Sequence, residues 1–168
     1  GQGGTENVVL QICEILKPEV NKVIVCSSGG VNVKKLNQLG VKHYTIPDIT
    51  NKSPQNVLKV IFRINQIVKK EKISIIHSHH RMAAFYAKII RNNKIIRIST
   101  AHNIFNDKLR FTNFSYRGSN IIAVGLGVAE NLINDFKIPK ENVTIIFNSV
   151  KAFSSPISLI EDFVEEKR

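Results

Sequence analysis

The chain has 168 residues, 43% of them hydrophobic, and a formal net charge of +11 from 24 Lys and Arg against 13 Asp and Glu. This length suits one domain with its own core, and no apolar run is long enough to span a bilayer, so we expect a soluble globular domain. The charge favours an anionic partner: a phosphorylated metabolite, an anionic membrane or a nucleic acid. Nucleic acid is the least supported of these, because the lysines are dispersed and no nucleic-acid-binding motif accompanies them.

A glycine-rich stretch opens the sequence and runs directly into a predicted helix. Three glycines occur at positions 1, 3 and 4, and the residues that follow place apolar side chains at helical spacing at Val8, Val9, Ile12, Ile15 and Leu16. A glycine loop at a helix start directs unpaired N–H groups and a partial positive charge at one point, which is typical of phosphate binding. Gly3 and Gly4 are therefore candidate phosphate-binding residues. The alternative is an ordinary helix start capped by Thr5 or Gly4.

The rest of the sequence alternates between short apolar runs and amphipathic segments. The apolar runs predict strands at 22–28, 43–46, 73–76, 94–99, 120–124 and 143–147. Helices are predicted at 33–39, from Pro54 onward, and at 82–91 and 128–136, and Gly40 is expected to end the first of these. Continuous β-branched strands between helices are typical of a parallel sheet covered on both faces. The sequence thus predicts an α/β fold with a doubly wound, Rossmann-like parallel sheet.

The two cysteines bear on the cellular compartment. Cys13 and Cys26 lie in apolar surroundings and have no metal-like spacing. They are interpreted as reduced core residues, which favours a cytoplasmic protein. No charged-then-apolar signal segment is found at the start of this sequence, which agrees with that expectation.

Polar residues gather where the predicted strands end. His77, His79 and His80 follow the 73–76 run, and His102 and Asn103 follow the 94–99 run. Ligands bind beyond the carboxyl ends of the strands in doubly wound sheets, so this edge is the candidate binding site. A neutral imidazole at His102 could orient or deprotonate a hydroxyl group. The alternative for each histidine is a structural role, with its nitrogens satisfied by neighbouring groups.

Three other chemistries are disfavoured by the same residues. On a strand His77 and His79 share a face while His80 points away, so the three imidazoles are badly placed to hold one metal ion, and no metal is expected. A nicotinamide cofactor is not expected either, because Glu6 stands where the G-x-G-x-x-G fingerprint needs glycine. The sequence also lacks the Gly-Lys-Ser/Thr of a Walker loop.

Five segments in order resemble a known family. They are Gly3–Glu6, Ile75–His79, Ser99–His102, Ile121–Val124 and the segment 138–148. Together they resemble the amino-terminal, acceptor-side domain of retaining family-4 glycosyltransferases, which have the two-domain GT-B fold. The resemblance covers residues 1–151. Residues 152–168 would then be a linker or tail leading toward a donor-binding domain that this chain lacks.

The resemblance implies a function and a set of roles. It implies transfer of a sugar from a nucleotide-sugar donor to a hydroxyl of a sugar, lipid-linked or small-molecule acceptor, with retention and without a cofactor or metal. Gly3 and Gly4 would lie by the donor diphosphate, and His102 at the reaction centre. The acceptor cleft would be bordered by His77, His79, His80 and Asn103. The protein would be cytoplasmic, with peripheral contact at the inner membrane face.

Two features set this sequence apart from the family pattern. Val124-Gly125 replaces the usual Val-Ser, and Asn148-Ser149-Val150-Lys151 replaces Asn-Gly-Val/Ile-Asp. In addition, a glycine loop of this kind normally follows the first, central strand, whereas this sequence begins at the loop. We therefore expect that strand to be absent, leaving two unpaired inner sheet edges and a chain that is inactive and poorly stable by itself. The rival interpretation is a basic Rossmann-like binding module for a phosphorylated metabolite, an anionic membrane or a nucleic acid.

Overall fold

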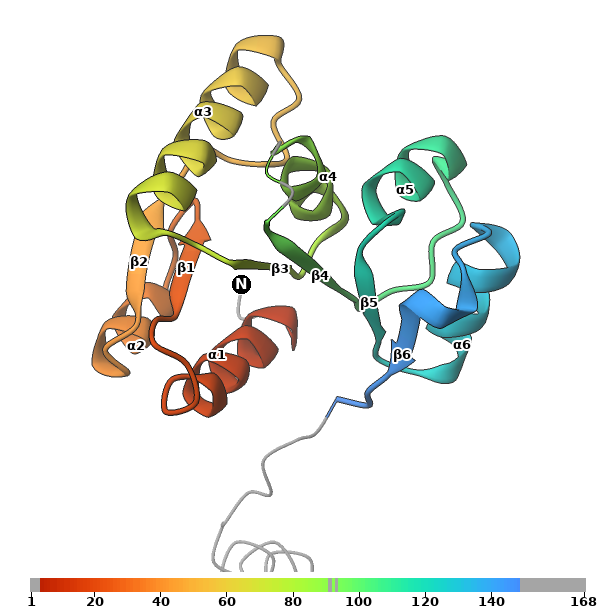
Figure 1. Ribbon diagram of the computed structural model, residues 1–168, viewed down its shortest axis with the longest axis horizontal. Coiled ribbons are helices and arrows are strands. Elements are labelled where there is room, and N and C mark those ends of the chain that lie inside the picture. The colour runs from red at the N-terminus through yellow and green to blue at the C-terminus, as the bar shows by residue number, and fades with distance from the viewer. Residues whose placement is uncertain (1–3, 91, 93, 149–168) are drawn as a thin grey trace, which may run out of the picture.

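The computed structural model describes residues 4–90, 92 and 94–148, and within them helices and strands alternate along the chain (Figure 1). The helices are α1 (Gly4–Leu16), α2 (Asn32–Gln38), α3 (Pro54–Glu71), α4 (Arg81–Ile89), α5 (Leu109–Tyr116) and α6 (Leu126–Glu130). The strands are β1 (Ile24–Ser27), β2 (Lys42–Thr45), β3 (Ile75–Ser78), β4 (Ile96–Ala101), β5 (Asn120–Ala123) and β6 (Val143–Ile145). A π-helical turn (Asn131–Asp135) and a 3-10 turn (Lys140–Asn142) lie between α6 and β6.

All strand pairings are parallel, and they form two sheets. β1 pairs with β2, and the second sheet has the order β3-β4-β5-β6. Figure 1 shows β2 and β1 together and, apart from them, β3, β4, β5 and β6 in this order, with α3, α4 and α5 on one side and α1 and α2 on the other. The predicted α/β, doubly wound parallel architecture is confirmed. Among the described residues, β1 and β3 each pair with one strand only. Strand pairing in the described residues is therefore interrupted between β1 and β3.

The predicted start of the longest helix is confirmed in detail. The hydroxyl of Ser53 accepts a hydrogen bond from the Asn56 N–H at 3.4 Å, and Pro54 occupies the first helical position. The helix ends at Lys72, whose φ of 51° is left-handed, so the chain turns sharply into β3. Gly40, with φ of 66°, follows α2 as expected.

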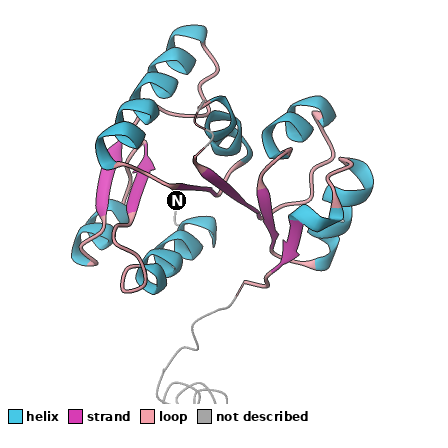
Figure 2. Cartoon of the chain, in the orientation of Figure 1, coloured by secondary structure: helices cyan, strands magenta, loops and turns pink. Residues whose placement is uncertain are grey.

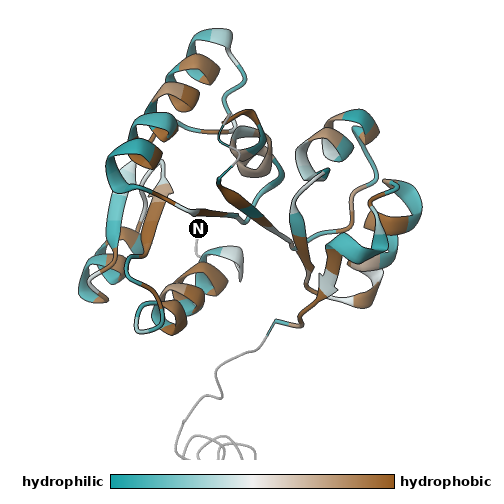
Figure 3. Ribbon diagram, viewed as in Figure 1, coloured by the Kyte–Doolittle hydropathy of each residue, from teal (hydrophilic) through white to brown (hydrophobic). Residues whose placement is uncertain are grey.

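The largest core cluster is built around strands of the four-stranded sheet. It comprises small residues of the strands, such as Ala101 and Ala123, packed against Tyr116 of α5 and Leu132 beyond α6. The two-stranded half has a smaller core around Cys13, Leu36 and Val41. Figure 3 shows the apolar residues concentrated on the strands and on parts of the surrounding helices. Cys26, predicted to lie in the core, is exposed.

A buried carboxylate joins the two-stranded sheet to the end of α3. The Glu71 side chain is 7% exposed and accepts hydrogen bonds from Lys22 Nζ at 2.8 Å, Lys42 Nζ at 2.7 Å and the Tyr44 hydroxyl. These donors hold the pKa of Glu71 at about 2. Because Lys22 precedes β1 and Lys42 and Tyr44 belong to β2, this one carboxylate fixes the position of that sheet against α3.

Several element boundaries differ from those predicted. α1 begins at Gly4, so this glycine belongs to the helix, and Gly3 lies outside the described residues. β5 and β6 end before Val124 and Ile146, and the predicted helix 128–136 is a short α6 that continues as the π-helical turn. Figure 2 shows the helices, strands and loops in different colours. In the part of the chain that the structure describes, no helix is both long and apolar enough to cross a membrane.

Candidate functional site

Three histidines from the ends of β3 and β4 lie together at the carboxyl edge of the larger sheet. The ring centroids of His77 and His79 are 4.2 Å apart, and those of His79 and His102 are 5.7 Å apart. His79 Nδ1 and His102 Nε2 are separated by 3.4 Å, and His77 Nε2 lies 2.8 Å from the Thr100 hydroxyl. The structure thus brings together three of the histidines that the sequence placed at this edge.

The parallel register of β3 and β4 explains this arrangement. Ser78 pairs with Ser99, and their hydroxyl oxygens are 2.8 Å apart in a buried position. Two short polar side chains fill the narrow space at the end of the strands and satisfy each other. His77 lies on the face of β3 opposite this serine pair, and the rings of His79 and His102, which follow the two strands, lie beside it.

Burial keeps the imidazoles neutral at physiological pH. It lowers the pKa of His79 to about 3, with smaller contributions from the neighbouring His77 and His102. Burial also lowers the pKa of His77, where His102 contributes as well, and that of His102. Since two neutral imidazoles can share one hydrogen, the His79–His102 contact is a hydrogen bond at neutral pH, and it leaves Nδ1 of His102 without a hydrogen-bond partner among the described residues.

The other two predicted acceptor-cleft residues lie at the start of the following segments. His80 is the N-cap of α4, and its Nδ1 accepts a hydrogen bond from the Met82 N–H at 3.1 Å. Burial lowers the pKa of His80, and the positive charge of Arg81 lowers it further. Asn103 is exposed, next to His102 on the loop that leaves β4. Capping occupies one nitrogen of His80, whereas the cleft roles of both residues remain predictions.

The loop after His102 is held by a buried asparagine from the π-helical turn. Asn131 is 6% exposed, and its side chain forms two hydrogen bonds with the backbone of Phe105: Oδ1 accepts from the N–H at 2.9 Å, and Nδ2 donates to the carbonyl at 3.0 Å. The same Nδ2 also donates to Asp135 at 2.7 Å. The Asn131 side chain therefore makes the pair of backbone hydrogen bonds that a neighbouring strand would make. It holds in place the loop that follows His102.

Arg81 fixes the same loop from the opposite side. Its Nη1 donates to Asp107 Oδ1 and to the Thr112 hydroxyl, both at 2.9 Å, and its guanidinium lies over the Phe105 ring at 4.7 Å from the centroid. Neither Arg81 nor Asn131 was predicted as a site residue. A partly buried arginine and an asparagine in a helix have no sequence signature that reveals partners more than 20 residues away, so no pattern could have identified them.

Gly4 lies at the start of α1, and the space around it is open. A Cβ added at this position would meet nothing within 4 Å, and its φ is outside the left-handed region. Neither packing nor backbone conformation in the described residues therefore requires glycine here. Among those residues no group of three or more His, Cys, Asp or Glu is arranged to hold a metal ion.

These features define a class of domain. A doubly wound parallel sheet with its polar residues on the carboxyl edge is a Rossmann-like domain, and its fold matches the corresponding domain of solved GT-B glycosyltransferases. The chain belongs to Glycosyltransferase Family 4, whose family model matches residues 2–152. No curated protein sequence matches it significantly.

Three solved structures show the same fold. A glycosyltransferase from Rickettsia africae ESF-5 superimposes with a TM-score of 0.80 at 22% identity, and HepE (Alr3699) from Anabaena, in complex with UDP and glucose, with 0.75 at 16%. MurG from Acinetobacter baumannii gives 0.64 at 17%. The matches cover 99%, 99% and 93% of this chain but only 46%, 47% and 45% of the other chains. The chain thus spans less than half the length of these proteins.

Proposed function

We propose that this chain is the acceptor-side domain of a glycosyltransferase that moves a sugar from a nucleotide-sugar donor to an acceptor hydroxyl with retention. The observation that carries the proposal is His102, held 3.4 Å from His79 Nδ1 at the carboxyl edge of a family-4 domain. The UDP and glucose in the Anabaena structure support a nucleotide-sugar donor. A second domain would supply most of the donor site, so the 168-residue chain alone should catalyse no transfer.

In this proposal the histidines position the acceptor. His102, hydrogen-bonded to His79 through Nε2, presents Nδ1 to an acceptor hydroxyl or to the transferred sugar. A retaining transfer does not require a strong protein base, so we assign His102 to positioning and charge stabilisation. His77, His79, His80 and Asn103 border the acceptor.

The glycines at the start of α1 would meet the donor diphosphate. Glycines at positions 3 and 4 would let a phosphate approach the N–H groups at the start of α1, where the helix dipole favours negative charge. The open space around Gly4 agrees with this role, because nothing in the described protein fills it. We place the protein in the cytoplasm, in keeping with the two free cysteines in the described residues.

The test requires a protein that joins this domain to a donor-binding domain. His102→Ala should lower the turnover number by roughly one to three orders of magnitude and change the melting temperature little. His43→Ala, on β2 outside the cluster, is the control and should keep the turnover number. A His102→Ala variant that loses stability but keeps its turnover number would show that His102 is structural.

Gly4→Ala tests the donor site separately. The added methyl group should leave the fold intact, because it meets no protein atom, but should raise KM for the nucleotide sugar. Unchanged donor kinetics would refute the assignment of Gly4. Polynucleotide binding that falls steeply with salt, in a two-domain protein with no transfer activity, would instead favour the basic binding module.

A further inference from the structure

The loop that follows β4, residues 102–108, begins with His102 and is anchored at Phe105. The Phe105 ring packs against the largest core cluster, with the ring centroids of Tyr116 and Phe136 at 6.1 Å and 6.2 Å. The backbone N–H and carbonyl of Phe105 are both bonded to the Asn131 side chain. Because His102 is three residues away from Phe105, the position of its ring depends on where that anchor is held.

Asn131 reaches this loop from a π-helical turn, which is a rare conformation. Asn131 is 6% exposed, and the next residue, Leu132, is fully buried in the core. An α-helix rotates by about 100° per residue, whereas the wider π-helical turn rotates each residue less, so two consecutive side chains can both face inward. Asn131 Nδ2 also donates to Asp135 at the end of the turn, which fixes the Nδ2 end of the amide toward the Phe105 carbonyl. Single π-helical turns of this kind occur frequently at functional sites.

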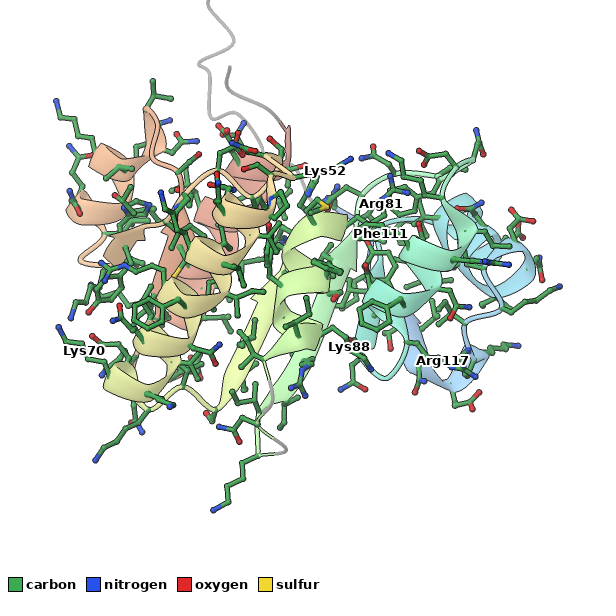
Figure 4. The ribbon with its side chains drawn as sticks, turned by 90° about the horizontal axis from the view of Figure 1, so that it is seen from above. Lys52, Lys70, Arg81, Lys88, Phe111 and Arg117 are labelled. Atoms are coloured by element: carbon green, nitrogen blue, oxygen red, sulfur yellow. The ribbon has the colours of Figure 1, made fainter. Side chains whose placement is uncertain are left out.

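Arg81 holds the same loop from the start of α4. Its guanidinium carbon lies 4.7 Å from the centroid of the Phe105 ring and 5.8 Å from that of Phe111. Figure 4 shows Arg81 beside Phe111, where α4 and α5 meet. The Arg81 side chain is 15% exposed, and its Nη1 is bonded to Asp107 and to the buried Thr112. Two residues of the loop are therefore tied to the first residue of α4.

We propose that Asn131 and Arg81 are positioning residues for the sugar transfer, which act through His102 and do not touch the substrate. This inference rests on the proposed function. Arg81 is two residues from His79 in the chain and contacts the loop that begins with His102, so it connects both members of the histidine pair. Asn131 fixes that loop against the core. A group that is held in place before the substrate binds needs no reorganisation during the reaction, so loosening either support should lower the turnover number.

The kinetic test uses a protein that joins this domain to a donor-binding domain. Asn131→Ala should lower the turnover number by roughly ten- to 100-fold, because displacing a reacting group by about 1 Å costs up to about 100-fold, and should leave KM for the donor unchanged. Asn56→Ala is the matched control. The Asn56 side chain donates to the carbonyls of Asp48 and Asn51, so this variant also removes two hydrogen bonds to the backbone of a loop, but of a loop without His102. It should keep the turnover number.

A second variant and a second measurement cover the case in which Asn131→Ala does not fold. Arg81→Met retains an unbranched side chain over the Phe105 ring but removes the hydrogen bonds to the loop and to α5, and it should also lower the turnover number. Nuclear magnetic resonance of the 168-residue chain needs no activity. In Arg81→Met, as in Asn131→Ala, the imidazole signals of His102 should shift and the Phe105 amide should exchange faster with solvent, whereas Asn56→Ala should leave both unchanged.

A double-mutant cycle separates positioning from general stability. Added to His102→Ala, Asn131→Ala should lower the turnover number by less than about twofold, because its effect passes through the missing imidazole. An undiminished loss in that background would overturn the inference. So would unchanged turnover numbers in Asn131→Ala and Arg81→Met while His102→Ala alone is impaired. A His102→Ala protein that keeps its turnover number would overturn the proposed function and this inference together.

Discussion

The half-buried His79 should make the stability of the domain fall as the pH drops below neutrality. Its pKa is about 3 in the folded chain, against an ordinary value of 6.5. Below pH 6.5 the unfolded chain therefore binds a proton that the folded chain does not, and stability present above pH 6.5 is lost progressively down to about pH 3. Between pH 7 and pH 5 this one residue accounts for a loss of about 2 kcal/mol.

The assay is urea unfolding at pH 7 and pH 5 with the variant His79→Asn. Asparagine retains a hydrogen-bonding atom near the position of Nδ1 but does not titrate, so the loss between the two pH values should shrink by about 2 kcal/mol. His43→Gln, outside the cluster, is the control. It should still show the loss of stability between pH 7 and pH 5 that is assigned to His79. Nuclear magnetic resonance titration of the imidazole protons gives a second readout. A His79 signal that titrates near pH 6.5, or an unchanged pH dependence in His79→Asn, would refute the reasoning.

Three further predictions concern stability. Glu71→Gln should destabilise the chain at pH 7, and the difference from the parent should disappear as the pH falls from 4.5 toward 2, because the depressed pKa of Glu71 contributes stability only above that range. Tyr86→Phe should be neutral or stabilise by up to about 1 kcal/mol in thermal unfolding, since the Tyr86 hydroxyl is buried without a hydrogen-bond partner among the described residues. Tyr44→Phe, which removes a hydrogen bond to Glu71, should lower the free energy of unfolding. A Tyr44→Phe chain that is more stable than the Tyr86→Phe chain would contradict this reasoning. A short apolar strand added before Gly1 should raise the melting temperature by pairing with β1 and β3; an unchanged melting temperature would count against the divided sheet as a weak point.

Local signals predicted most of the fold. Ser53 and Pro54 mark the start of α3 by their own chemistry, and the apolar runs around Val25, Ile75 and Ile98 are strands. The sequence did not predict side-chain contacts between separate helices and strands. Arg97, in the middle of an apolar run, donates from Nε to the Ala87 carbonyl at 2.9 Å and from Nη2 to the Ile90 carbonyl at 2.6 Å, so it satisfies the end of α4. No periodicity in the sequence encodes that contact.

The candidate site was predictable in its location but not in its supports. Alternation along a strand placed His77 and His79 on one face, and the shared carboxyl edge of parallel strands brought His102 beside them. The side chains that hold the His102 loop, Arg81 and Asn131, act over long sequence separations. Their partners depend on how α4 and the π-helical turn pack, which single-sequence patterns do not specify.

The two parts of the proposed site are supported by hydrophobic cores of different size. The histidines are anchored on the four-stranded sheet and its large core, whereas Gly4 begins α1, whose core is the small cluster around Cys13. Among the described residues the two sheets share no strand pairing, and Glu71 ties the smaller one to α3. Small cores open at lower free energy than large ones, so weakening the Glu71 contacts should loosen α1 before it disturbs the histidines. In a two-domain protein Glu71→Gln should therefore raise KM for the donor while leaving acceptor recognition by the His79–His102 pair in place.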